Sequence, residues 1–151
     1  MEKKRTYQWV CMVLFSLLIS CQKHEVNTNK FGKQSRWQVT TIQIGSNGNS
    51  VLPKWEVSPS ENAEEYGSAV WVHMDGSRST FKWIFKHYQN AFVFFPDNSV
   101  EQDVGCKAYL QCSNLSGEYK IITDKSKMFE FESLETSGYP GISVFIQIQP
   151  M

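Results

Sequence analysis

The sequence lacks the short motifs that mark several large enzyme classes. It has no Gly-x-Ser-x-Gly, no phosphate-binding glycine loop and no His-Glu-x-x-His. Its three histidines are His24, His73 and His87, and no second Cys/His pair stands at the spacing of a zinc site. We therefore expect no enzymatic activity, no metal and no cofactor. The alternative is a hydrolase whose site is assembled from residues far apart in the sequence.

Two pairs of residues are candidates for catalysis or metal binding. His73 and His87 lie on either side of a predicted hairpin and could form a base or metal pair, but two unrelated polar strand residues explain them better. Glu130 and Glu132 share one face of a predicted strand. Paired carboxylates can act as acid and base, although a solvated face explains this pair better. No catalytic residue is predicted from either pair.

No apolar run is long enough to cross a membrane as a helix. The longest relevant run, from Val10 to Ile19, has ten residues, and a spanning helix needs about 20. Lys3, Lys4 and Arg5 precede this run. A positive region followed by a short apolar region is typical of a secretory signal, which we assign to residues 1–20.

The signal ends in Leu18-Ile19-Ser20-Cys21, which resembles the lipobox of bacterial lipoproteins. This resemblance implies that Cys21 becomes the first mature residue and carries acyl chains such as palmitate. In that family an Asp after the Cys often retains the protein in the inner membrane. Here Gln22 follows, so the resemblance implies the outer membrane, on a face that stays open. The alternative is an ordinary cleaved signal in which Cys21 is incidental.

The mature chain has the charge balance and length of one secreted domain. Removal of residues 1–20 leaves 12 basic and 14 acidic residues, a net charge of −2 with histidines neutral. This balance does not indicate a nucleic-acid partner. Residues 21–35 are polar and lack periodicity, which predicts a flexible tether behind the lipidated Cys, and residues 36–151 form the domain.

Two cysteines remain once Cys11 is removed with the signal and Cys21 is lipidated. Cys106 and Cys112 would then lie in an oxidising compartment, which favours a disulfide. A bridge requires residues 107–111 to turn back, because six extended residues would hold the two Cα atoms about 20 Å apart. The alternative is two separately buried thiols.

From Arg36 onward, apolar residues alternate with polar ones and are interrupted by turn residues every eight to twelve positions. Asn47-Gly48 and Asp75-Gly76 predict hairpin turns, and a phase slip near Thr41 predicts a bulge. Period-two alternation at this spacing is typical of a small all-β domain. We expect a single antiparallel barrel of about eight to ten strands with at most one short helix.

Two families resemble parts of this domain. Arg36-Trp37 in the first strand, meander-like hairpins and a closing C-terminal strand resemble lipocalin-like domains, although Ser35 replaces the Gly of the usual Gly-x-Trp. That resemblance implies a barrel that holds a small apolar ligand. Gly105-Cys106-Lys107 and the strand from Gly117 are similar to the META or heat-shock-lipoprotein pattern, where Asn is usual at position 107.

The aromatic content supplies the candidate ligand-binding residues. Trp71 alternates with Val70 and Val72 and so lies on the face opposite them; Trp55 and Trp83 are the next candidates. Aromatic side chains can line a lumen or simply fill a core. We expect a lipid-anchored, non-enzymatic envelope protein that binds a small apolar ligand or a partner protein. The alternative is a structural subunit of an outer-membrane assembly without a pocket.

Overall fold

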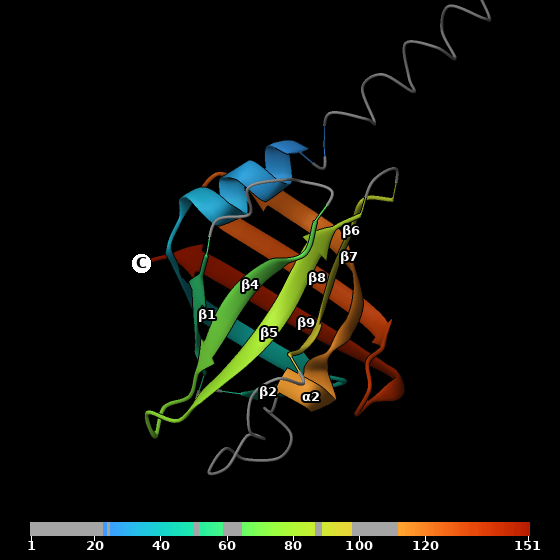
Figure 1. The fold of residues 1–151 in the computed structure, drawn as a ribbon. Helices are drawn as coiled ribbons and strands as arrows, with labels where there is room; N and C mark the ends of the chain where they lie inside the picture. Colours follow the sequence, from blue (N-terminus) through green and yellow to red (C-terminus); the bar gives the residue numbers. More distant parts are fainter. Residues whose placement is uncertain (1–22, 24, 50–51, 59–64, 87–88, 98–111) are drawn as a thin grey trace, which may run out of the picture.

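The computed structural model describes residues 23, 25–49, 52–58, 65–86, 89–97 and 112–151 (Figure 1). Two short helices accompany the strands, where we expected at most one: residues 25–33 and α2 (Cys112–Leu115). The nine strands are β1 (Arg36–Ile44), β2 (Asn47–Asn49), β3 (Lys54–Val57), β4 (Gly67–Val72), β5 (Arg78–Phe85), β6 (Ala91–Pro96), β7 (Gly117–Lys125), β8 (Met128–Glu135) and β9 (Pro140–Pro150).

The strands form a closed antiparallel barrel. Each strand from β3 to β8 pairs with the next along the chain, β1 pairs with β3, and β9 returns to pair with β1. Eight strands close the barrel, while the short β2 extends one end of β1 as a hairpin. The prediction of one small all-β barrel is confirmed.

β1 closes the barrel because both of its edges are used. One edge pairs with β9 from Trp37↔Pro150 to Ile44↔Val144, and the other pairs first with β3 and then with β2. The register with β9 shifts between Val39 and Thr41, which confirms the predicted bulge. A bulge adds one residue to a strand and bends it, which helps a sheet curl into a barrel.

The barrel interior is filled largely by aromatic rings. Side chains alternate between interior and exterior along the strands, as the period-two pattern predicts. The largest side chains with almost no exposed surface are Trp37, Trp55, Trp71, Trp83, Tyr119, Phe31, Phe81, Phe85, Phe92, Phe94, Phe129 and Phe131. These rings, with the branched residues of β9, form one hydrophobic core.

Part of the segment predicted to be a tether is folded. Residues 25–33 form a helix that covers one end of the barrel, opposite α2 (Figure 1). Phe31 on this helix is fully buried, with its ring centroid 4.7 Å from that of Trp83 and 5.5 Å from that of Phe92. The prediction of a flexible tether was wrong for these residues, because one aromatic side chain anchors an otherwise polar segment in the core.

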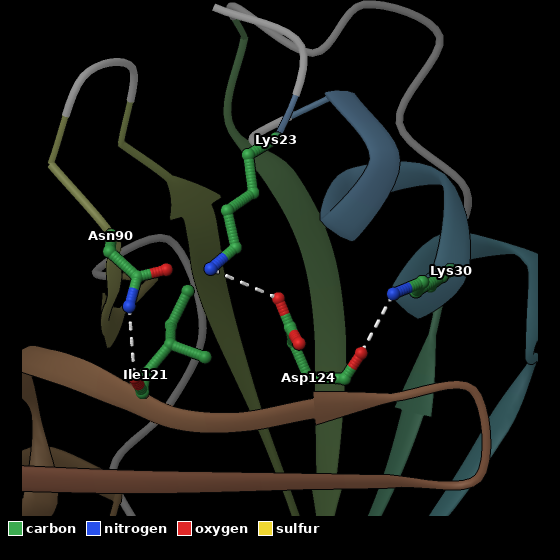
Figure 2. A network of polar contacts seen from close by, with 5 residues as sticks. All are labelled: Lys23, Lys30, Asn90, Ile121 and Asp124. Atoms are coloured by element: carbon green, nitrogen blue, oxygen red, sulfur yellow. Dashed lines mark hydrogen bonds and ion pairs between the residues drawn. The ribbon is translucent and has the colours of Figure 1, made fainter. Parts of the chain in front are cut away.

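Polar contacts hold the same helix against the β7–β8 hairpin (Figure 2). The ammonium group of Lys30 donates to the backbone carbonyl of Asp124 at 2.7 Å, and that of Lys23 lies 3.4 Å from the Asp124 carboxylate. Nearby, the Asn90 side-chain amide donates to the carbonyl of Ile121 at 3.0 Å. The helix is therefore fixed to the barrel by both its apolar and its polar side chains.

The two predicted hairpin turns have different outcomes. The turn at Asp75-Gly76 is confirmed: the Gly76 N–H donates to the His73 carbonyl, and Gly76 has a φ of 85°. The first turn lies two residues earlier than Asn47-Gly48, because Ile44 pairs with Asn47 across the two residues between them. Gly45 takes the positive φ of 57° that this turn requires.

Within the described residues, no helix is long and apolar enough to cross a membrane.

Candidate functional site

The three tryptophans predicted to face a ligand all lie inside the barrel. Trp55 on β3, Trp71 on β4 and Trp83 on β5 have no exposed surface. Trp55 and Trp71 are register partners, so their indole rings lie together with centroids 5.4 Å apart. Trp83 lies nearer the helix of residues 25–33, where its ring contacts Phe31. The structure therefore brings two of the three candidates together and places the third closer to that helix.

Trp83 makes the contacts of a residue that packs the barrel interior. Its indole N–H donates to the backbone carbonyl of Ser68 at 3.2 Å. Its ring lies against Gly67, where an added Cβ would come within 2.3 Å of the indole Cε2. A glycine is required there because any side chain would occupy the space of this ring.

Trp37 also lies in this interior, although it was not among the predicted ligand-binding residues. Its indole N–H donates to the backbone carbonyl of Phe31 at 3.0 Å, and the two rings stack with centroids 5.4 Å apart. Its place near the start of a strand was evident, but its acceptor lies on a helix that the sequence pattern does not show. Like Trp83, Trp37 has its only polar group satisfied.

Trp55 and Trp71 differ from these two in their polar groups. The indole Nε1 atoms of both are fully buried, and neither finds a hydrogen-bond acceptor in the part of the chain that the structure describes. A buried donor without an acceptor costs about 1–3 kcal/mol, since it gives up its bonds to water without replacing them. Two such donors on neighbouring rings mark this region as the candidate site.

Aromatic rings and one buried histidine surround the two indoles. Phe81 and Phe94 contact both, with ring centroids 5.4–5.9 Å away. Nε2 of His73 is hydrogen-bonded to Oγ of Ser79 at 3.0 Å, and the His73 ring lies 6.3 Å from that of Trp71. Among the described residues no buried side chain is Lys, Arg, Asp or Glu. The site is therefore mostly apolar, with a few hydrogen-bonding groups.

Near α2 the interior also contains the buried hydroxyl of Tyr119. The Tyr119 hydroxyl donates to the carbonyl of Leu115 at 2.6 Å, and its ring stacks on Phe94 with centroids 5.4 Å apart. Burial, and after it the neighbouring Cys112, raises the pKa of Tyr119 well above its usual value. Tyr119 therefore stays neutral and keeps its hydrogen bond to the Leu115 carbonyl, which helps to position α2.

The other predicted residues lie elsewhere in the structure or fall outside the described residues. Glu130 and Glu132 lie on the outer face; Glu130 accepts from Gln147 at 2.8 Å and Glu132 from Ser143 at 3.1 Å. No group of potential metal ligands occurs in the described part of the chain. His24, Cys21, Cys106 and His87 lie outside the described residues. Cys112 is buried at the start of α2, and its bridge to Cys106 stays a prediction.

A surface depression at the end of β9 is another candidate. It has a volume of about 350 Å³ and is lined by Gln34, Lys127, Gln149 and Pro150. Its lining consists of exposed or half-buried side chains. It contains no buried polar group that would orient a ligand, so the interior indoles are the stronger candidate.

Comparison with models of known protein families gives no match, and comparison with curated proteins finds no similar sequence. The function is therefore argued from the barrel and its interior.

Proposed function

We propose that this protein is a lipid-anchored, non-enzymatic protein of the cell envelope that binds a small apolar ligand inside its barrel. The observation that carries this proposal is the pair of buried indole N–H groups, on Trp55 and Trp71, that lack an acceptor in the described part of a closed barrel. Eight-stranded up-and-down barrels are about wide enough to hold one small ligand, as lipocalins do. The strand order here has the same simple meander.

The proposed anchor is the lipid on Cys21, and the proposed location is the outer membrane. The support is the Leu18-Ile19-Ser20-Cys21 sequence behind a short apolar run, together with Gln22 at the sorting position. Several acyl chains on one residue supply the multiple signals that stable anchoring requires. The proposed partners are the membrane and the ligand, with no nucleic acid.

A second candidate is a structural subunit that uses its outer surface. Tyr66 and Phe95 are 56% and 37% exposed, and their rings contact each other on the barrel exterior with centroids 5.2 Å apart. Exposed aromatic residues are common at protein interfaces. In this case the barrel interior would serve only as a core, and a partner protein would cover the Tyr66–Phe95 pair.

Native mass spectrometry of the protein purified from its own membrane tests both candidates. We expect a mass increased by acyl chains on Cys21 and a further, dissociable small molecule. The matched control is the full-length Cys21→Ser variant, which should lose the acyl mass and leave the membrane fraction. An acylated protein that carries a stable partner protein and no small molecule would favour the structural subunit. A Cys21→Ser variant that stays in the membrane would contradict the anchor.

A further inference from the structure

We propose that the ligand is an uncharged molecule with an apolar, flat body and a carbonyl-type oxygen that accepts hydrogen bonds from Trp55 and Trp71. This inference rests on the proposed function and adds the chemical class of the ligand. Its basis is the contrast among four tryptophans in one barrel interior.

The contrast separates the tryptophans into two pairs. Trp37 and Trp83 donate to backbone carbonyls of the chain, at 3.0 and 3.2 Å. Trp55 and Trp71 are equally buried, yet their indole N–H groups find no acceptor among the described residues. A phenylalanine at either position would fill much of the same space without a buried donor. The N–H groups are thus explained by an acceptor that lies outside the described residues, which we assign to the ligand.

The positions of these two residues place both donors in one region. Trp55 and Trp71 face each other across β3 and β4, and their rings are 5.4 Å apart. A carbonyl oxygen has two lone pairs and can therefore accept two hydrogen bonds. One carbonyl group, from a ketone, an ester or an amide, would satisfy the pair.

The absence of buried lysine and arginine among the described residues favours an uncharged ligand. None of the buried side chains in the described residues is a lysine or an arginine, and the buried polar groups near the indoles are His73 and Ser79. A carboxylate placed there would lose its hydration without gaining a lysine or arginine as partner. A neutral carbonyl pays a much smaller desolvation cost and gains the same donors.

The aromatic residues around the indoles indicate the shape and polarity of the ligand. Phe81, Phe92 and Phe94 contact Trp55 with ring centroids 5.4–6.3 Å away. Aromatic rings prefer offset stacked or edge-to-face contacts with other flat groups. A flat, apolar group attached to the carbonyl therefore suits this lining.

The test uses three probes that share a benzene ring: acetophenone, ethylbenzene and benzoate. They carry a neutral acceptor, no acceptor and a charged acceptor. Each is titrated into the ¹⁵N-labelled full-length protein, and the indole N–H resonances are followed by NMR. We expect acetophenone to bind about tenfold more tightly than ethylbenzene, because it gains two hydrogen bonds. It should also move the Trp55 and Trp71 indole protons downfield and leave those of Trp37 and Trp83 in place.

Three variants assign the effect to the donors. Trp55→Phe and Trp71→Phe keep an aromatic ring and remove one N–H each, so each should weaken acetophenone binding several-fold with little change for ethylbenzene. Trp83→Phe is the matched control, since its N–H is already bonded to Ser68. It should not change the preference for acetophenone over ethylbenzene. The wild-type indole shifts provide a readout that does not depend on how well any variant folds.

The outcomes separate this inference from the proposed function. Equal binding of acetophenone and ethylbenzene would overturn the inference and leave apolar ligand binding intact. Tighter binding of benzoate would overturn the choice of an uncharged ligand. If no probe binds and the Trp55 and Trp71 N–H groups contact only water, both the inference and the proposed function are wrong.

Discussion

The indole of Trp37 both stacks on the ring of Phe31 and donates its N–H to the Phe31 backbone carbonyl. Trp37 stands near the start of β1, whereas Phe31 lies on the helix of residues 25–33. This double contact fixes the helix to the wall of the barrel. The Phe31 ring also contacts aromatic rings from β3, β5, β6 and β8, so the helix is part of the core.

Truncation of Phe31 should therefore destabilise the whole barrel. We expect Phe31→Ala to lower the free energy of unfolding by about 3–5 kcal/mol, as for other fully buried phenylalanines. Val26 on the same helix is 47% exposed, so Val26→Ala should change stability by less than about 0.5 kcal/mol. Denaturant titration followed by circular dichroism measures both variants. Similar small losses for the two would show that the helix is not part of the cooperative fold.

The four interior tryptophans should respond differently to loss of their N–H. Trp37→Phe leaves the Phe31 carbonyl without its donor, whereas Trp71→Phe removes a donor that has no acceptor in the described residues. We expect Trp37→Phe to cost about 1 kcal/mol more than Trp71→Phe in the ligand-free protein. Urea unfolding of the two variants provides the measurement. Equal costs would contradict the difference in hydrogen bonding.

The approach of Trp83 to Gly67 predicts a strong effect of a single methyl group. An added Cβ at Gly67 would lie 2.3 Å from the Trp83 ring, so Gly67→Ala should cost about 1–3 kcal/mol or more through forced repacking. A Cβ at Gly48 meets nothing within 4 Å. Gly48→Ala is therefore the matched control and should change the melting temperature little.

Glu130 should show a pKa that depends on its neighbour Thr123. The hydrogen bond from the Thr123 hydroxyl, and after it that from Gln147, lowers the pKa of Glu130 below its ordinary value of 4.5. The folded pKa lies below the unfolded one. The ionised carboxylate therefore stabilises the fold above about pH 4.5, and this contribution is lost as the pH falls through the folded value.

Thr123→Val removes the larger of the two hydrogen bonds and should raise the pKa of Glu130 toward 4.5. An NMR titration of the Glu130 carboxyl carbon measures this change. Asp75 serves as the internal reference, because its pKa is lowered by hydrogen bonds from Ser77 within the turn between β4 and β5. A shift of both carboxyl groups together would indicate a general change rather than the loss of one bond.

Strand alternation made much of the barrel predictable. Val70, Trp71 and Val72 alternate between half-buried and buried exactly as their sequence order requires, and the bulge at Thr41 was visible as a slip in the same pattern. Period-two burial is a local property of each strand, so a single sequence can show it. Closure by β1 and β9 followed from the fold class rather than from any particular residue.

The helix of residues 25–33 was not predictable by the same means. Its buried side chains are Phe31 and the polar Asn27 and Thr28, and one apolar residue among polar ones produces no hydrophobic helical periodicity. Its formation depends on rings supplied by four distant strands. Tertiary contacts of this kind override local composition, which here is that of a polar linker.

The site was predictable in its residue type and not in its polar detail. Trp71 was predicted because it lies on the strand face opposite Val70 and Val72, and Trp55 and Trp83 were the next candidates. Which of their N–H groups would find an acceptor depends on the backbone of neighbouring elements, such as the carbonyl of Ser68 for Trp83. Such a hydrogen bond depends on the exact distance and angle between donor and acceptor, which the alternation of apolar and polar residues does not predict.

The docked helix has a consequence for how the protein would sit once Cys21 carries lipid. Glu25, at the helical end of the segment, is four residues from Cys21, and four fully extended residues reach at most about 14 Å. A connection this short would keep the helix-covered end of the barrel near the bilayer and α2 at the end away from it. If the proposed lipid and ligand are both present, the ligand would enter and leave this end of the barrel next to the lipid phase.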